Sequence, residues 1–151
     1  MSLLLRIVRK SRWLGNPLWL AAGEMQADPL ADLRTSSNSL SVWEVTDDRS
    51  NLEDIVVGIA SSKDYLANVD YALFEESIVG GLGIQIELTP GTTPHARANP
   101  WHRELVRLSA RKLVDLAHLM MKKATLERVQ ENRVGMLVER SGVPVRWNEP
   151  D

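Results

Sequence analysis

The residues of this chain that are best suited to acid–base or metal chemistry are two histidines and a nearby carboxylate. His95 and His102 lie close together in the sequence, and Glu104 follows the second histidine at a His-x-Glu spacing. An imidazole exchanges protons near neutral pH, and two imidazoles with a carboxylate can bind a divalent metal. Metal-binding histidines on one helix usually occupy positions i and i+4, whereas this pair spans a predicted loop–helix boundary. We therefore expect no metal and no other cofactor, and the sequence leaves open whether the two imidazoles meet.

Local motifs in this sequence do not assemble a catalytic site. The absence of cysteine excludes thiolate nucleophiles, disulfides and zinc sites with cysteine ligands. Adjacent carboxylates such as Glu75 and Glu76 point apart on a strand or a helix, and Gly80–Gly83 lacks the lysine and hydroxyl of a nucleotide-binding P-loop. The sequence favours a non-catalytic protein. A small hydrolase-like enzyme with a histidine–carboxylate site near residues 80–104 is an alternative, since residues distant in sequence can meet in a fold.

A row of basic residues is the strongest candidate for a binding surface. Asn99 and Pro100 are typical of a helix start, and apolar residues then recur at helical spacing as far as Ala124. This pattern predicts an amphipathic helix over residues 100–124. The candidate binding residues on its outer face are Trp101, Arg103, Arg107, Arg111 and Lys122. Because Trp and Arg dominate the energetics of protein interfaces, we expect a binding or regulatory module whose partner is another protein or a second copy of the chain.

Nucleic-acid binding is the alternative for the same basic helix, since arginines spaced along one helix face can contact successive phosphates. Against it, residues 28–94 carry a net charge of −9 while residues 95–124 carry +5, so the helix can equally pair with acidic residues of the same fold. The aromatic composition also favours a protein partner, because five tryptophans outnumber two tyrosines and one phenylalanine. We expect Trp43 in the core and Trp13 and Trp101 at the surface.

Length and composition indicate one globular domain over residues 1–151, with residues 148–151 as a loose tail. The chain is 44% hydrophobic and 25% charged, which is typical of a protein that buries a core. No apolar run approaches the roughly 20 residues that span a bilayer. The N-terminal apolar run precedes the first basic cluster, which is the reverse of a secretory signal. Together with the lack of cysteine, these features predict a cytoplasmic protein that does not contact a membrane.

Strand-like and helix-like segments follow one another without regular βαβ alternation, which predicts an α+β fold. Strands are expected at residues 3–8, 38–45, 69–74 and 84–88, and helices at 28–33, 50–61, 100–124 and 126–141. We expect Ser50 and Glu53 to form a capping box and Gly80–Gly83 to form the turn of a hairpin. The expected architecture is a small, mostly antiparallel sheet with two to four helices on one face. A mostly helical body with one appended hairpin is the alternative.

Overall fold

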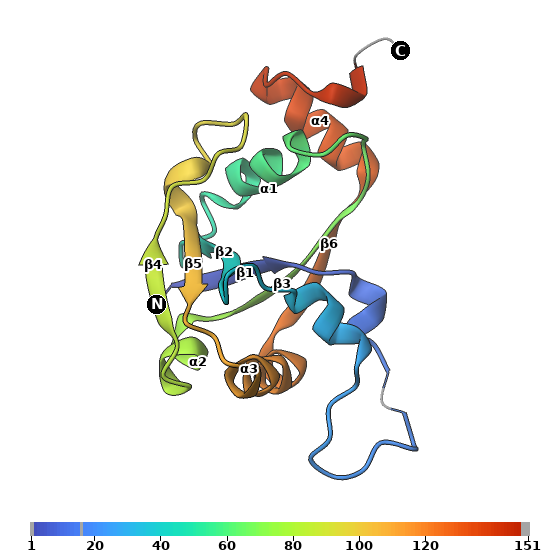
Figure 1. Cartoon of the computed structure of the whole chain (residues 1–151). Helices are drawn as coiled ribbons and strands as arrows, with labels where there is room; N and C mark the ends of the chain where they lie inside the picture. The colour runs from blue at the N-terminus through green and yellow to red at the C-terminus, as the bar shows by residue number, and fades with distance from the viewer. Residues whose placement is uncertain (1, 16, 149–151) are drawn as a thin grey trace.

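The computed structural model describes residues 2–15 and 17–148, and its centre is a six-stranded sheet in which all neighbouring strands are antiparallel (Figure 1). The strand order is β4-β5-β2-β1-β3-β6. The strands are β1 (Leu3–Ile7), β2 (Leu40–Val45), β3 (Val69–Glu75), β4 (Gln85–Leu88), β5 (His102–Val106) and β6 (Thr125–Val129). The α+β class and the antiparallel sheet predicted from the sequence are therefore confirmed.

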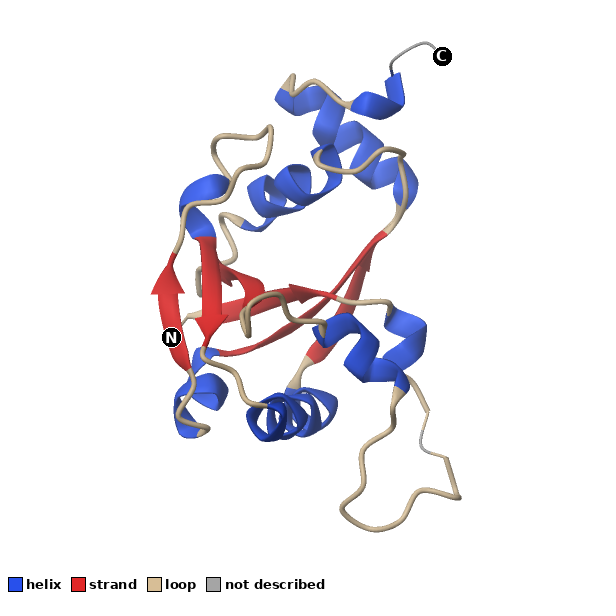
Figure 2. Ribbon diagram, in the orientation of Figure 1, coloured by secondary structure: helices blue, strands red, loops and turns tan. Residues whose placement is uncertain are grey.

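Helices cover both faces of the sheet, as Figure 2 shows, and not the single face that we expected. The helices are α1 (Leu52–Ser61), α2 (Glu76–Gly81), α3 (Ala110–Lys123) and α4 (Glu131–Ser141). The 3-10 helices are η1 (Lys10–Trp13), η2 (Asp28–Leu33), η3 (Asn99–Trp101) and η4 (Arg146–Asn148). On one face α1 packs against α4, and on the other α3 packs against α2 and η2. Among the described residues, no helix combines the length and the apolar character needed to cross a membrane.

The two helical layers enclose two separate hydrophobic cores. Leu4 packs with Leu116 of α3 in one core, whereas its neighbour Leu5 packs with Ile55 of α1 in the other. Successive side chains of a strand point to opposite faces, so the uninterrupted apolar start of β1 fits a strand that is buried on both sides.

The helix predicted over residues 100–124 is wrong in its first half, where the chain forms η3 and β5. Asn99 does not cap a helix; its side chain bonds to the loop before it. The true N-cap is Ser109, whose hydroxyl oxygen accepts a hydrogen bond of 3.1 Å from a backbone N–H of the first turn of α3. Between β5 and α3, Arg107 adopts φ = 55°, a left-handed conformation that an α-helix cannot contain. The second half of the predicted helix is confirmed as α3.

The predicted hairpin around Gly80–Gly83 is also wrong. The chain forms α2 between β3 and β4, and the two strands lie far apart in the sheet, since β4 pairs with β5 while β3 pairs with β1 and β6. The strand over residues 84–88 nevertheless exists as β4. Its sequence pattern shows a strand but carries no information about which partner the strand will find.

Two further local predictions need correction. The capping box does not form, because α1 starts after Asn51, the backbone N–H of Ser50 donates to Asp48, and Glu53 pairs with Arg133 of α4. Where a helix was predicted over residues 126–141, the chain first forms the strand β6, and the helix α4 begins only at Glu131. The predicted end of that helix is confirmed.

Gly142 caps α4 with φ = 73°. The expected strands over residues 3–8, 38–45 and 69–74 are confirmed as β1, β2 and β3, and the short helix at 28–33 is confirmed as the 3-10 helix η2. The predicted loose tail lies outside the described residues except for Asn148, which ends η4.

Candidate functional site

The structure separates the five residues that were predicted to form one binding surface. Trp101 lies in η3 and packs, half-buried, against the core around α1. Arg103 lies on β5, where its guanidinium donates a 2.6 Å hydrogen bond to Glu44 of β2 and its side chain is only 11% exposed. Arg103 therefore supports the sheet through an ion pair with a neighbouring strand.

The other three predicted residues are exposed but do not continue a single row. Arg107 occupies the turn before α3, whereas Arg111 and Lys122 lie near opposite ends of that helix. Arg111 approaches Asp115 one turn away at 3.4 Å. The premise of a common helix face is wrong, while the role of each residue in binding stays a prediction.

His102 belongs to a polar cluster on the sheet surface. Its Nδ1 lies 2.7 Å from the carbonyl oxygen of Thr89, so that nitrogen carries the proton, and Nε2 lies 3.7 Å from Oε1 of Glu104. The same carboxylate oxygen accepts a 2.8 Å hydrogen bond from the hydroxyl of Ser41. The ring of Trp43 meets the imidazole edge to face, with centroids 4.9 Å apart. All four of these residues line a cavity beside Thr89, and all but Glu104 also line a second cavity that adjoins it.

This cluster can bind a polar ligand and exchange a proton with it through His102. It does not form a nucleophile–base pair, because the Ser41 hydroxyl donates to Glu104 and not to the imidazole. The hydrogen bond between nucleophile and histidine that a serine hydrolase requires is therefore absent from this cluster.

His95 occupies a different position and has a different partner. Its side chain is buried, and Nε2 lies 2.8 Å from Oδ1 of Asp54 on α1. This contact fixes the loop before η3 against the helix. His95 and His102 do not converge, and within residues 2–15 and 17–148 no cluster of three or more His, Asp or Glu side chains could hold a metal.

The tryptophans are distributed differently from our expectation. Trp13 was expected at the surface, but it is 4% exposed and its indole N–H donates to Asp32. Trp43 is buried as expected. The exposed tryptophan is Trp19, at 77%, and it lies in a segment for which the sequence patterns predicted no defined element.

Trp19 lies in a loop that projects from the body of the protein between η1 and η2 (Figure 1). We call this segment the 14–27 loop; residue 16 is outside the described residues. Two consecutive turns shape it, one closed by the N–H of Leu20 on Pro17 and one by the N–H of Glu24 on Ala21. Three of its large apolar side chains are exposed, namely Leu14 at 57%, Leu18 at 103% and Trp19 at 77%, whereas Leu20 and Met25 are half-buried.

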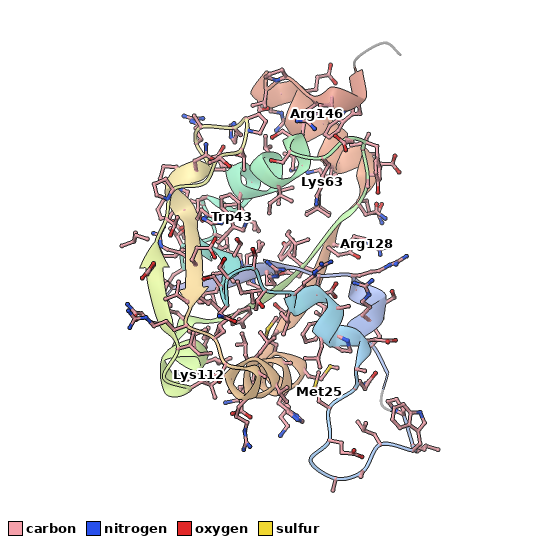
Figure 3. The ribbon with its side chains drawn as sticks, in the orientation of Figure 1. Met25, Trp43, Lys63, Lys112, Arg128 and Arg146 are labelled. Carbon is pink, nitrogen blue, oxygen red and sulfur yellow. The ribbon has the colours of Figure 1, made fainter. Side chains whose placement is uncertain are left out.

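The base of the 14–27 loop is firmly attached to the domain. The Asp32 carboxylate accepts hydrogen bonds from the backbone of Arg9 (2.9 Å), the guanidinium of Arg12 (2.6 Å) and the indole of Trp13 (2.8 Å). On the returning side, Met25 packs against the core next to α3, as Figure 3 shows. The loop therefore displays an apolar tip on an ordered base.

The chain matches no protein-family model, and no curated protein or solved structure shows detectable similarity to it.

Proposed function

We propose that this protein is a non-catalytic binding module that engages a protein partner through the tip of the 14–27 loop. The observation that carries the proposal is the pair Leu18 and Trp19, adjacent and both largely exposed on a projecting loop. Soluble domains seldom leave neighbouring large apolar side chains in water unless those side chains have a partner.

The energetics of the tip favour an interface. Transfer of an exposed leucine or aromatic side chain into an apolar cleft contributes about 1.5–3 kcal/mol per side chain. Tryptophan is also among the residues most enriched at the energetic centres of protein interfaces. The Asp32 hydrogen bonds at the base of the loop reduce the conformational entropy that binding must remove.

The two alternative functions have less support. The nucleic-acid alternative requires the basic residues to share one helix face. Arg103 instead pairs with Glu44 on the sheet, away from the exposed cations of α3. The hydrolase-like alternative has a histidine–carboxylate contact at His102 and Glu104, but this contact lacks a nucleophile bonded to the histidine.

The test is affinity capture of the tagged protein from its native cell extract, read by mass spectrometry. We expect one specific protein to be captured by the wild type and by Met136→Ala, and to be lost from Leu18→Ala/Trp19→Ala. Met136 is the matched control because it is an apolar side chain on α4 that is 51% exposed. Both variants should keep the wild-type free energy of unfolding within about 0.5 kcal/mol, since exposed side chains contribute little to it.

Equal capture by the tip variant and the wild type would overturn the proposal, as would the absence of both a specific captured protein and self-association. A nuclease-treated sample separates protein from nucleic acid, because loss of the captured protein with nuclease would show that nucleic acid bridges the two. Sedimentation of the purified protein tests self-association. A concentration-dependent dimer that is absent from the tip variant would identify the partner as a second copy of the chain.

A further inference from the structure

A cavity of about 410 Å³ lies at the end of the sheet, next to the cavity that His102 lines, with which it shares Ile7, Ile59 and Lys63. The carboxyl end of β1 and the start of β3 form its floor, and the last turn of α1 and the C-terminal segment with η4 form its walls. Its volume falls within the range of about 300–1,000 Å³ that small-molecule sites occupy. No described residue of the 14–27 loop lines it, although Arg9, whose backbone N–H donates to Asp32 at the base of that loop, does.

The interior of this cavity is suited to a flat apolar group. Ile7, Ile59 and Val69 contribute apolar surface, and Tyr65 and Trp147 contribute aromatic rings. Tyr65 is 71% exposed although it lines the cavity, so its ring is available for contact with a ligand. Aromatic rings pack favourably against each other in offset or edge-to-face arrangements.

The charges around the cavity favour an anion. Its acidic side chains already have partners: Asp64 pairs with Arg146 at 2.9 Å, and Asp70 is held by Arg128 through contacts of 2.7 and 3.1 Å. Arg128 also lowers the pKa of Asp70, so that carboxyl stays ionised and paired.

Two cations at the same cavity remain available. The side chains of Arg9 and Lys63 both line it, are exposed, and form no ion pair with any other described residue. Figure 3 shows Lys63 on the side of the sheet that carries α1 and α4. Lys63 also lines the adjoining cavity, as does the half-buried Arg6.

We propose that this cavity binds a small organic anion with an aromatic body, its ring against Tyr65 and Trp147 and its charged group at Arg9 and Lys63. The aromatic rings determine the shape of the ligand, and the two free cations determine its charge. The proposal is independent of the partner-binding tip.

The test uses two dyes that share an aromatic body and differ in charge. 1-Anilinonaphthalene-8-sulfonate carries a sulfonate, and N-phenyl-1-naphthylamine lacks it. Titration of the intact protein, followed by dye fluorescence, should show one saturable site for the sulfonate dye. We expect Arg9→Ala/Lys63→Ala to weaken the binding of the sulfonate dye by about tenfold and to leave the affinity for the neutral dye unchanged. The matched control is Lys122→Ala/Lys123→Ala, which removes two exposed cations from α3 and should have no effect.

Further variants locate the site and define the ligand. Tyr65→Ala should weaken the binding of both dyes, whereas Leu18→Ala/Trp19→Ala should weaken the binding of neither. Loss of dye binding only in Leu18→Ala/Trp19→Ala would place the dye on the loop and overturn the proposal. Equal sulfonate-dye affinity in wild type and Arg9→Ala/Lys63→Ala would also overturn it. Displacement of the dye by 1-naphthoate but not by decanoate supports an aromatic ligand, and the reverse result contradicts the aromatic assignment.

Discussion

At the residue scale, single carboxylates attach the segment around η1 to η2 and to the sheet. Asp32 binds the residues around η1, and Asp70 accepts hydrogen bonds from the backbone of Lys10 and from the guanidinium of Arg128. A carboxylate that is held by cationic and N–H donors favours its ionised form, and Asp70 shows this through a lowered pKa whose largest cause is the hydrogen bond from Arg128. These attachments join residues that are distant in sequence, and no local pattern indicates them.

The lowered pKa of Asp70 predicts a pH-dependent contribution to stability. A carboxyl whose pKa is lower in the folded than in the unfolded chain stabilises the fold above its unfolded pKa of about 3.9. That contribution is lost as the pH falls through the folded pKa. We expect Asp70→Asn to lower the free energy of unfolding by about 1 kcal/mol at pH 7, and the two proteins to converge in stability in more acidic solution. Urea unfolding between pH 2.5 and 7 measures the difference.

The matched control for this prediction is Asp64→Asn, which removes a carboxylate that is 74% exposed and pairs with Arg146, itself 70% exposed. We expect this variant to differ little from the wild type at any pH, because exposed ion pairs contribute little to stability. A constant difference between Asp70→Asn and the wild type across the pH range would contradict the role assigned to Asp70.

At the element scale, most strands and helices could be predicted from the sequence, while their boundaries and partners could not. The alternation in β2 and the helical spacing in α3 are local signals, and both elements form. The five residues of β5 were assigned to a helix because Pro100 and a helix-like spacing precede α3. The missed signal was Ser109, a good N-cap in the position where α3 begins.

The candidate sites were predictable only in part, because the sequence does not reveal which elements pair with one another. The sequence patterns identified His102 and Glu104 as residues capable of chemistry, but Ser41 reaches them from β2 through strand pairing. The exposed tip was not predicted, because leucine and tryptophan beside Pro17 fit a buried element as well as a projecting loop. Exposure depends on what the rest of the chain covers, which local spacing does not reveal.

The packing of α1 predicts an unusual effect of a glycine substitution. A Cβ added to Gly58 would lie 2.6 Å from the Cβ of Ala98 and 3.1 Å from the hydroxyl of Thr93. Alanine normally stabilises a helix interior relative to glycine by about 1 kcal/mol, but overpacking costs about 1–3 kcal/mol. We expect Gly58→Ala to lower the melting temperature, as measured by thermal unfolding followed by circular dichroism.

The control is Gly135→Ala in the interior of α4, where the added Cβ would meet Leu66 at an ordinary contact distance of 3.5 Å. This variant should be as stable as the wild type or more stable, because it gains helix propensity without a clash. If Gly58→Ala were as stabilising as Gly135→Ala, the loop containing Ala98 would have to shift away from α1 at no cost. That result would contradict the attachment of this loop to α1 through His95 and Asp54.

At the scale of the whole molecule, one sheet separates two hydrophobic cores, and β1 contributes to both. Leu4 and Leu5 are adjacent, almost fully buried, and point to opposite cores. Because β1 pairs with β2 on one side and β3 on the other, neither core can lose this strand without disrupting the sheet that supports the second. The fold should therefore unfold as one cooperative unit.

Substitution of each leucine tests this cooperativity. We expect Leu4→Ala and Leu5→Ala each to reduce the free energy of unfolding by about 2–5 kcal/mol, the range for cavities created in well-packed cores. Hydrogen exchange read by mass spectrometry should show the slowest amides of α3 and of α4 accelerating to the same extent in both variants. These helices report on opposite cores, with Leu116 in one and Val134 in the other. Faster exchange confined to α3 in Leu4→Ala and to α4 in Leu5→Ala would instead show two independently unfolding layers, because a cooperative sheet transmits the loss of either contact to both of its faces.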